Sequence, residues 1–215
     1  MKNLNHLILC TFIISSMIIV GGGCTQDALF NKNIIKNGDA EEGPAVPING
    51  NVTRQLPEHW TDVEGKMWIS KYGEGAGREL AEADVRGKGE NYFWGGKNSN
   101  STIEQMADVS PIQQEIDAGK VSYELSGLLG GYRSQSDRAK LVADFLDAGN
   151  DVIQSTQIDF VTNEDRNNVT RMMRKVSSGT VPINTRTIRF RLITLIEEGA
   201  NNDGYADELS MVLRK

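Results

Sequence analysis

The sequence predicts an all-β protein, an antiparallel β-sandwich, and three observations support this prediction. Apolar and polar residues alternate with a period of two in several segments, as they do in strands that bury one face. Turn-forming residues are dense: there are 22 glycines, with glycine pairs at 95–96 and 130–131. Helical periodicity is confined to the short segments 78–86 and 163–175, and the second also fits a strand. Strands separated by frequent turns indicate two packed antiparallel sheets.

The start of the chain predicts export. Lys2 and His6 precede an apolar run at 7–20, and three glycines then lead to Cys24. This order is typical of a signal peptide, and the run falls short of the roughly 20 residues that span a bilayer. Small residues before a cysteine resemble a bacterial lipoprotein signal, in which the peptidase cuts before the cysteine and its sulfur carries lipid. Ordinary cleavage that leaves a free thiol is the alternative.

Composition excludes some classes of stabilising bond, ligand and active site. Cys10 lies in the segment to be removed, so the mature chain can form no internal disulfide and must be held by its core or by a metal. The net charge of −6 disfavours nucleic-acid binding but is compatible with neutral ligands and cations. With only His6 and His59 present, a histidine-rich zinc site is excluded, and a Ser-His-Asp triad would need His59.

The elements are expected in the following order. Residues 1–23 form the signal peptide, 24–33 a polar tether and 34–215 one sandwich domain. Alternating segments predict strands at 121–126, 140–145, 152–158, 187–195 and 209–213. The turn-forming cluster at 147–151 predicts that the second and third of these strands make a hairpin.

Three segments together carry a resemblance to a known family. Residues 34–41 are Ile-Ile-Lys-Asn-Gly-Asp-Ala-Glu, and Trp60 follows a proline-containing loop. Residues 123–132 are Tyr-Glu-Leu-Ser-Gly-Leu-Leu-Gly-Gly-Tyr, and residues 203–211 are Asp-Gly-Tyr-Ala-Asp-Glu-Leu-Ser-Met. The chain from 34 to 213 thus resembles the galactose-binding-like jelly-roll fold of many secreted carbohydrate-binding modules, although Ala40 replaces the family's usual aromatic residue. The resemblance implies a jelly roll that binds carbohydrate or glycan.

The resemblance also implies a structural calcium site. Its ligands would be the carboxylates of Glu41 and Asp207, with the carbonyl of Asp39 beside them. Calcium takes about six to eight oxygen ligands, and an ion here would tie the two ends of a domain that has no disulfide. The alternative is that Glu41 is a solvated surface acid and Asp207 a turn residue.

Aromatic residues supply the candidate ligand-binding surface. Exposed rings offer stacking area for a sugar, flanked by polar side chains that form hydrogen bonds. The first candidate is Tyr132 with Arg133 and Asp137, which follow the second glycine pair and which we expect in an exposed loop. The second candidate is Trp68 with Tyr72.

For each aromatic residue the alternative is a place in the core. In an alternating strand Tyr92 and Trp94 share one face while Phe93 takes the other, so one of these faces must be core. We expect Trp60 in the core as well.

Motifs for catalysis are missing from the sequence. It contains no Gly-x-Ser-x-Gly, no His-Glu-x-x-His and no phosphate loop. We therefore expect a non-catalytic protein of the cell envelope, anchored in the membrane by lipid on Cys24, that binds carbohydrate and not nucleic acid. The alternatives are a structural or adhesive envelope protein that binds another protein, and a glycoside hydrolase with an unrecognised carboxylate pair.

Overall fold

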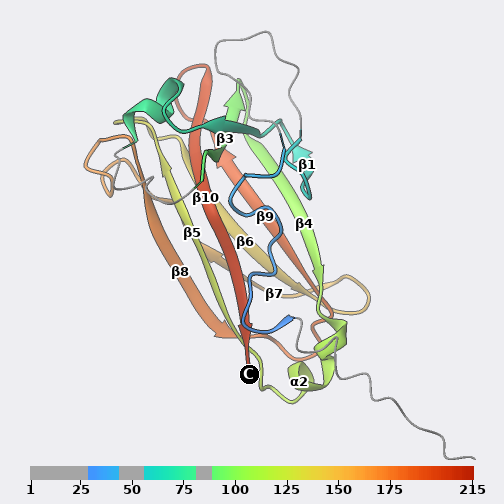
Figure 1. The fold of residues 1–215 in the computed structure, drawn as a ribbon. Coiled ribbons are helices and arrows are strands. Elements are labelled where there is room, and N and C mark those ends of the chain that lie inside the picture. Colours follow the sequence, from blue (N-terminus) through green and yellow to red (C-terminus); the bar gives the residue numbers. More distant parts are fainter. Residues whose placement is uncertain (1–28, 44–55, 81–88) are drawn as a thin grey trace, which may run out of the picture.

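The structure, a computed structural model, describes residues 29–43, 56–80 and 89–215. The predicted signal peptide and Cys24 lie outside these residues. Two five-stranded antiparallel sheets pack face to face, which confirms the predicted sandwich (Figure 1). In the part of the chain that the structure describes, no helix has the length and apolar character needed to cross a membrane.

The two sheets are called sheet A and sheet B. Sheet A has the strand order β2 (Trp68–Lys71), β3 (Asn91–Lys97), β10 (Asn201–Arg214), β5 (Ser122–Gly131) and β8 (Arg171–Thr180). Sheet B has the order β1 (Thr61–Glu64), β4 (Ser101–Asp108), β9 (Thr187–Leu195), β6 (Arg138–Leu146) and β7 (Val152–Ile158). The helices are short: η2 (Gly75–Glu79), η3 (Ser110–Ile112) and α2 (Gln113–Asp117).

The strand order is that of a jelly roll. From β3 onward the chain places β3, β10, β5 and β8 side by side in sheet A, and β4, β9, β6 and β7 in sheet B. This is the eight-strand arrangement of two Greek keys, and β2 and β1 add one strand to the edge of each sheet. The predicted hairpin is β6–β7, and its turn is closed by the Asp147 carboxylate, which accepts hydrogen bonds from the amides of Gly149 and Asp151.

The core lies between the sheets and is built from alternate strand positions. Ile188, Phe190 and Leu192 point inward from β9 and are fully buried, as the period-two pattern predicts. Trp60 is 3% exposed and packs edge-on against Phe93 with ring centroids 5.8 Å apart. The prediction that Trp60 is a core residue is therefore confirmed.

The first and last segments of the domain lie side by side. The amide of Ile34 donates to the Met211 carbonyl at 2.9 Å, and the amide of Leu209 donates to the Gly38 carbonyl at 2.8 Å. Residues 33–38 therefore pair with the part of β10 that β3 leaves open, and Figure 1 shows this blue segment running along the red strand. Through these hydrogen bonds the segment 33–38 covers the edge of β10 around residues 209–211.

The segment 163–175, which fits either a helix or a strand in sequence, forms turns before β8 begins at Arg171. Arg166 explains the turns, because its fully buried guanidinium donates to three backbone carbonyls. Two of these belong to Arg133 and Gln135, at 2.8 and 2.9 Å, and the third belongs to Val169 at 3.0 Å. Arg166 therefore fixes the backbone of the loop that follows β5. Of the other helical candidate, 78–86, only its start is described, as the end of η2.

Candidate functional site

The outer face of sheet A carries a second cluster of apolar side chains, separate from the core. Tyr92 and Trp94 of β3 and Tyr205 of β10 are buried in it, while Phe93 points into the core. The prediction that Tyr92 and Trp94 share one face is confirmed. The remaining members, buried or partly buried against these rings, are Trp68, Tyr72, Leu80, Leu128, Tyr132 and Met172. We call this surface the aromatic face.

A cavity of about 280 Å³ opens at one end of the aromatic face, and we call it the aromatic cavity. Three of its lining residues are aromatic, three carry a side-chain amide or carboxyl group, and one is a glycine. The lining residues are Gly75, Tyr92, Trp94, Tyr132, Gln135, Asn201 and Asp203. They come from η2, β3, the loop that follows β5, and β10, so the site exists only in the folded sheet.

Asp203 is the charged residue of the cavity. It is 6% exposed, and its Oδ1 atom accepts hydrogen bonds from Trp94 Nε1 at 3.2 Å and from Tyr205 Oη at 3.0 Å. Burial is the main effect and raises the pKa of the Asp203 carboxyl, with a further contribution from Asp137, while the two hydrogen bonds oppose the rise. Both donors are neutral, so the carboxylate charge is solvated only by dipoles.

Two other polar atoms at the cavity have no partner in the described part of the chain. The Tyr92 hydroxyl and the Gln135 amide oxygen are buried without a hydrogen bond. Ser70, which faces Tyr92 across the strands, does not meet hydrogen-bond geometry with it. Burial raises the pKa of Tyr92 to about 12, so this hydroxyl keeps its proton. An unmade buried hydrogen bond costs about 1–3 kcal/mol.

Three of the residues predicted to bind ligand lie together on the aromatic face. Tyr132 lines the cavity, and Trp68 and Tyr72 pack beside it against Trp94 and Tyr92, with ring centroids 5.8 and 5.0 Å apart. The two candidate clusters of the sequence are thus parts of one surface.

Arg133 lies at the rim of the same surface. Its guanidinium makes a two-point contact with Glu79, at 2.7 and 2.5 Å, and its Cζ lies 4.8 Å from the centroid of the Tyr132 ring. The Tyr132 hydroxyl also donates to Glu79, at 2.9 Å. Glu79 of η2 therefore holds the loop after β5 at the mouth of the cavity.

Asp137 is placed differently from the exposed loop position that the sequence predicts. Its side chain is fully buried and accepts hydrogen bonds from the backbone amides of Glu197 at 2.6 Å, Glu198 at 3.1 Å and Asp203 at 2.8 Å. Asp137 therefore fixes the start of β10 and with it Asp203, and has no exposed oxygen to offer a ligand.

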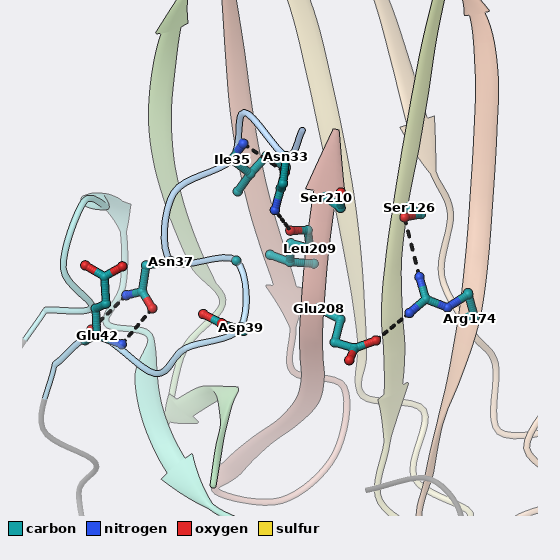
Figure 2. Close-up of a pocket in the computed structure, with 11 residues that line it drawn as sticks. Asn33, Ile35, Asn37, Asp39, Glu42, Ser126, Arg174, Glu208, Leu209 and Ser210 are labelled. Carbon is teal, nitrogen blue, oxygen red and sulfur yellow. Dashed lines mark hydrogen bonds and ion pairs between the residues drawn. The ribbon is translucent and has the colours of Figure 1, made fainter. Parts of the chain in front are cut away.

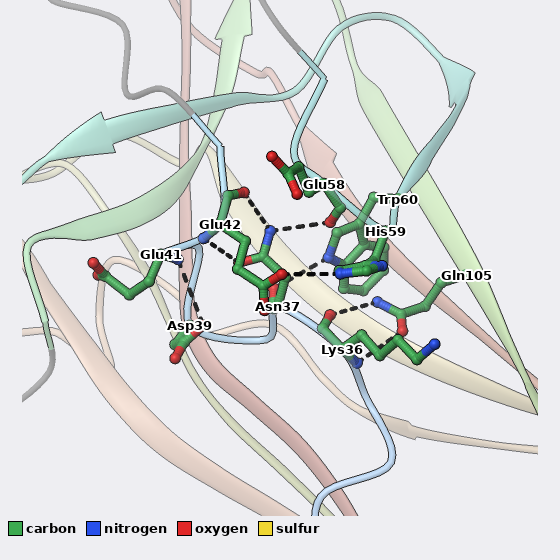
Figure 3. Close-up of polar contacts among 9 residues, drawn as sticks. All are labelled: Lys36, Asn37, Asp39, Glu41, Glu42, Glu58, His59, Trp60 and Gln105. Atoms are coloured by element: carbon green, nitrogen blue, oxygen red, sulfur yellow. Dashed lines mark hydrogen bonds and ion pairs between the residues drawn. The ribbon is translucent and has the colours of Figure 1, made fainter.

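The three predicted calcium ligands do not form a cluster. Glu41 Oε1 accepts hydrogen bonds from the amides of Glu90 at 2.9 Å and Asn91 at 2.8 Å. Asp207 is fully buried, with Oδ2 bound to Tyr72 Oη at 2.5 Å. Asp39 is exposed, and Figure 3 shows its carboxylate beside the Glu41 amide; the oxygen that the sequence assigns to the ion is the Asp39 carbonyl, which these contacts do not involve. The carboxylates of Glu41 and Asp207 are thus each engaged by donors of the protein, and the calcium site stays a prediction from the sequence.

In the N-terminal motif 34–41, Asn37 joins the loop at Glu42 to the loop at Glu58. Asn37 is 5% exposed, and its Nδ2 donates to the carbonyls of Glu42 at 2.7 Å and Glu58 at 3.0 Å (Figure 3). Its own carbonyl accepts a hydrogen bond from Trp60 Nε1 at 3.2 Å. This network brings ligand atoms of Glu42, Glu58 and His59 within 4.8 Å of one another, but all three side chains are exposed. An exposed acidic group of this kind is by itself no site.

A second hollow, of about 450 Å³, lies between the N-terminal segment and the middle of sheet A. Figure 2 shows Arg174 of β8 reaching toward Ser126 of β5 and forming an ion pair with Glu208 of β10. The described residues that line this second hollow include no aromatic ring. It therefore lacks the stacking area that the aromatic cavity offers, which leaves the aromatic cavity as the candidate functional site.

No protein-family model matches this sequence, and no curated protein matches it either. Solved structures resemble it in fold. The enzymatically active domain of tailspike protein 4 from bacteriophage CBA120 has a TM-score of 0.50 at 11% identity; the match covers 85% of this chain and 21% of that one. The CBM22-1 xylan-binding domain from Paenibacillus barcinonensis Xyn10C has a TM-score of 0.43 at 14% identity, covering 74% of this chain and 88% of that one. At these identities the likeness concerns the fold alone.

Proposed function

We propose that this protein binds carbohydrate in the aromatic cavity and does not transform it. The observation that carries the proposal is one cavity in which the rings of Tyr92, Trp94 and Tyr132 stand beside the polar groups of Gln135 and Asp203. A sugar ring has apolar C–H faces that stack on aromatic rings and hydroxyl groups that bond to planar polar side chains. Pockets for drug-sized ligands start at roughly 300 Å³, so about 280 Å³ suits a single ring-sized group.

The acids around the cavity support binding rather than hydrolysis. A glycosidase needs two carboxyl groups that flank the scissile bond and are available to it. Glu79 is engaged by Arg133, whose hydrogen bond lowers the pKa of Glu79, and Asp137 is engaged by three backbone amides. Among the described residues, Asp203 is the acid that remains at the cavity, and one carboxyl cannot act as both acid and base across a glycosidic bond.

We expect Tyr132→Ala to weaken glycan binding by about tenfold or more, because the substitution removes a ring on which the sugar stacks. Tyr132 is only partly buried, so we expect the variant to fold. A glycan array would find a ligand for the purified protein, and isothermal titration calorimetry would then compare the variants. Phe160→Ala is the matched control: this ring is also half-buried and lies beneath Arg138 and Lys140, at 4.9 and 5.1 Å, outside the cavity.

Two results would contradict the proposal. Equal affinities for wild-type protein, Tyr132→Ala and Phe160→Ala would remove the aromatic cavity as the site. Retention on no glycan, together with co-purification of an envelope protein, would favour the adhesive alternative.

Export and lipid attachment at Cys24 remain part of the proposal on sequence grounds, because a lipid would hold the sugar-binding domain at the cell envelope. We expect Cys24→Ser to move the protein from the membrane fraction to the soluble fraction of cells that carry out lipoprotein processing. Fractionation followed by immunoblotting would measure the shift. An unchanged distribution would instead favour ordinary signal cleavage, after which Cys24 has no anchoring role.

A further inference from the structure

The charges that line the aromatic cavity are unbalanced. Asp203 is the one charged residue among the seven that line it, and neither lysine nor arginine is included. Arg133 lies nearby at the rim, but its guanidinium is committed to Glu79 through two contacts. Among the residues that the structure describes, the cavity therefore presents the Asp203 carboxyl group, the Gln135 side chain and three aromatic residues, and no cation lines it.

Asp203 contrasts with the buried carboxylate of sheet B. Asp144 is 1% exposed, and it pairs with Arg189 at 2.9 Å and with Arg191 at 2.9 Å. Burial alone would raise the pKa of Asp144, but hydrogen bonds from Ser155 and the two arginines lower it overall. Asp203 has neutral donors in place of arginines, and in the described part of the chain no ion pair reaches it. Among the described residues, Asp203 therefore lacks the internal counter-charge that Asp144 has, and a cationic ligand could supply one.

Aromatic rings favour the same kind of ligand. The face of a Trp, Tyr or Phe ring attracts a cation within about 6 Å, most strongly when the cation is shielded from water. Tyr92, Trp94 and Tyr132 supply three such rings around the cavity that Asp203 lines. The same chemistry is visible at the rim, where the Arg133 guanidinium lies over Tyr132. An acidic sugar would meet Asp203 without a compensating cation.

We propose that the ring bound in the aromatic cavity carries a protonated amine, so that the ligand is a glycan with a free hexosamine residue and Asp203 is its counter-ion. The inference rests on the proposed carbohydrate-binding function and names the ligand class for that same site. The ammonium group donates to the Asp203 carboxylate and lies against the partly exposed Tyr132 ring, while the hydroxyl groups of the sugar meet Gln135. Asp203 is thus a specificity-determining residue that discriminates by charge.

Calorimetry with oligosaccharides of one length tests this directly. The probes are a glucosamine oligomer, its fully N-acetylated counterpart, a glucose oligomer and an oligomer that contains glucuronic acid. We expect the glucosamine oligomer to bind about tenfold or more tightly than its N-acetylated counterpart, since a charged hydrogen bond is worth more than a neutral one. Asp203→Asn should abolish this preference, so that the glucosamine oligomer and its N-acetylated counterpart bind with affinities within about threefold of each other.

Asp203→Asn also changes the group that accepts hydrogen bonds from Trp94 and Tyr205, so a second variant is needed. Gln135→Lys adds a cation to the cavity wall and leaves those bonds intact. We expect it to weaken binding of the glucosamine oligomer and to admit the glucuronic-acid oligomer, with a melting temperature near that of the wild type.

The possible outcomes separate the two proposals. Equal binding of the amine and N-acetyl oligomers, with both weakened by Tyr132→Ala, overturns the charge selection and leaves carbohydrate binding in place. Binding of a simple amine such as ethanolamine, but of no oligosaccharide, supports ammonium recognition and overturns the assignment to a sugar. Binding of none of the probes overturns both.

Discussion

Gly38→Ala is expected to lower the free energy of unfolding by about 3 kcal/mol or more. A methyl group at this position would lie 2.1 Å from the carbonyl oxygen of Leu209 and 3.0 Å from its carbonyl carbon. Both are main-chain atoms of β10, so no side-chain rotation can relieve the overlap. The N-terminal segment would have to withdraw from β10 and lose the hydrogen bond between the Leu209 amide and the Gly38 carbonyl.

Urea unfolding followed by tryptophan fluorescence would measure this loss. Gly149→Ala is the matched control, because its new methyl would meet only the Asp147 and Asp151 carboxylate oxygens, at 3.3 and 3.7 Å. We expect this control to lie within about 0.5 kcal/mol of the wild type. If both variants unfold at the same urea concentration, the N-terminal segment does not contribute to the stability of the sandwich.

The period-two pattern succeeded where one face of a strand meets the core and the other meets water. Ile188, Phe190 and Leu192 point inward from β9 and alternate with half-buried residues, so the sequence alone predicts this strand. For β3 the pattern cannot show which face lies in the core between the sheets, because both faces are buried. Phe93 packs in the sandwich, while Tyr92 and Trp94 are buried within the aromatic face.

The cavity could be predicted only in part. Tyr132 was found from its place after a glycine pair, but Asp203 meets Trp94 across 109 residues of sequence. The partners of Asp137 likewise lie 60 to 66 residues away, and they convert an expected ligand residue into a buried anchor. Such contacts arise from the jelly-roll order of the strands, which brings β3, β5 and β10 together. Local patterns in one sequence do not contain this information.

Asp207→Asn is expected to stabilise the protein at pH 8 by about 3 kcal/mol and to have little effect at pH 5. Burial is the main cause that raises the pKa of Asp207 from 3.8 to about 8, with smaller contributions from Glu208 and Asp39. Between these values the folded carboxyl holds a proton and the unfolded one does not. The stability of the wild type therefore falls as the pH rises from about 4 to about 8 and levels off above.

The asparagine variant removes this dependence because it cannot ionise, and it keeps the local bonds. Its Oδ1 atom can still accept from the Glu208 amide, and its amide group can donate to Tyr72 Oη, which then acts as the acceptor. Urea unfolding at pH 5 and pH 8 would measure the difference. Asp151→Asn is the control, since Asp151 is exposed and is not among the groups that raise the pKa of Asp207; its change should stay within about 0.5 kcal/mol at both pH values.

The same variant tests the calcium site that the sequence implies. An ion bound by Asp207 would require the ionised carboxylate, so Asp207→Asn would then lower the melting temperature in calcium, and a chelator would abolish the difference. A buried, protonated carboxyl predicts the opposite sign at pH 8 and no response to chelator. Because Tyr72 packs on the aromatic face and bonds to Asp207, the sign of this one substitution also shows whether a metal or a proton holds Tyr72 in place beside the cavity.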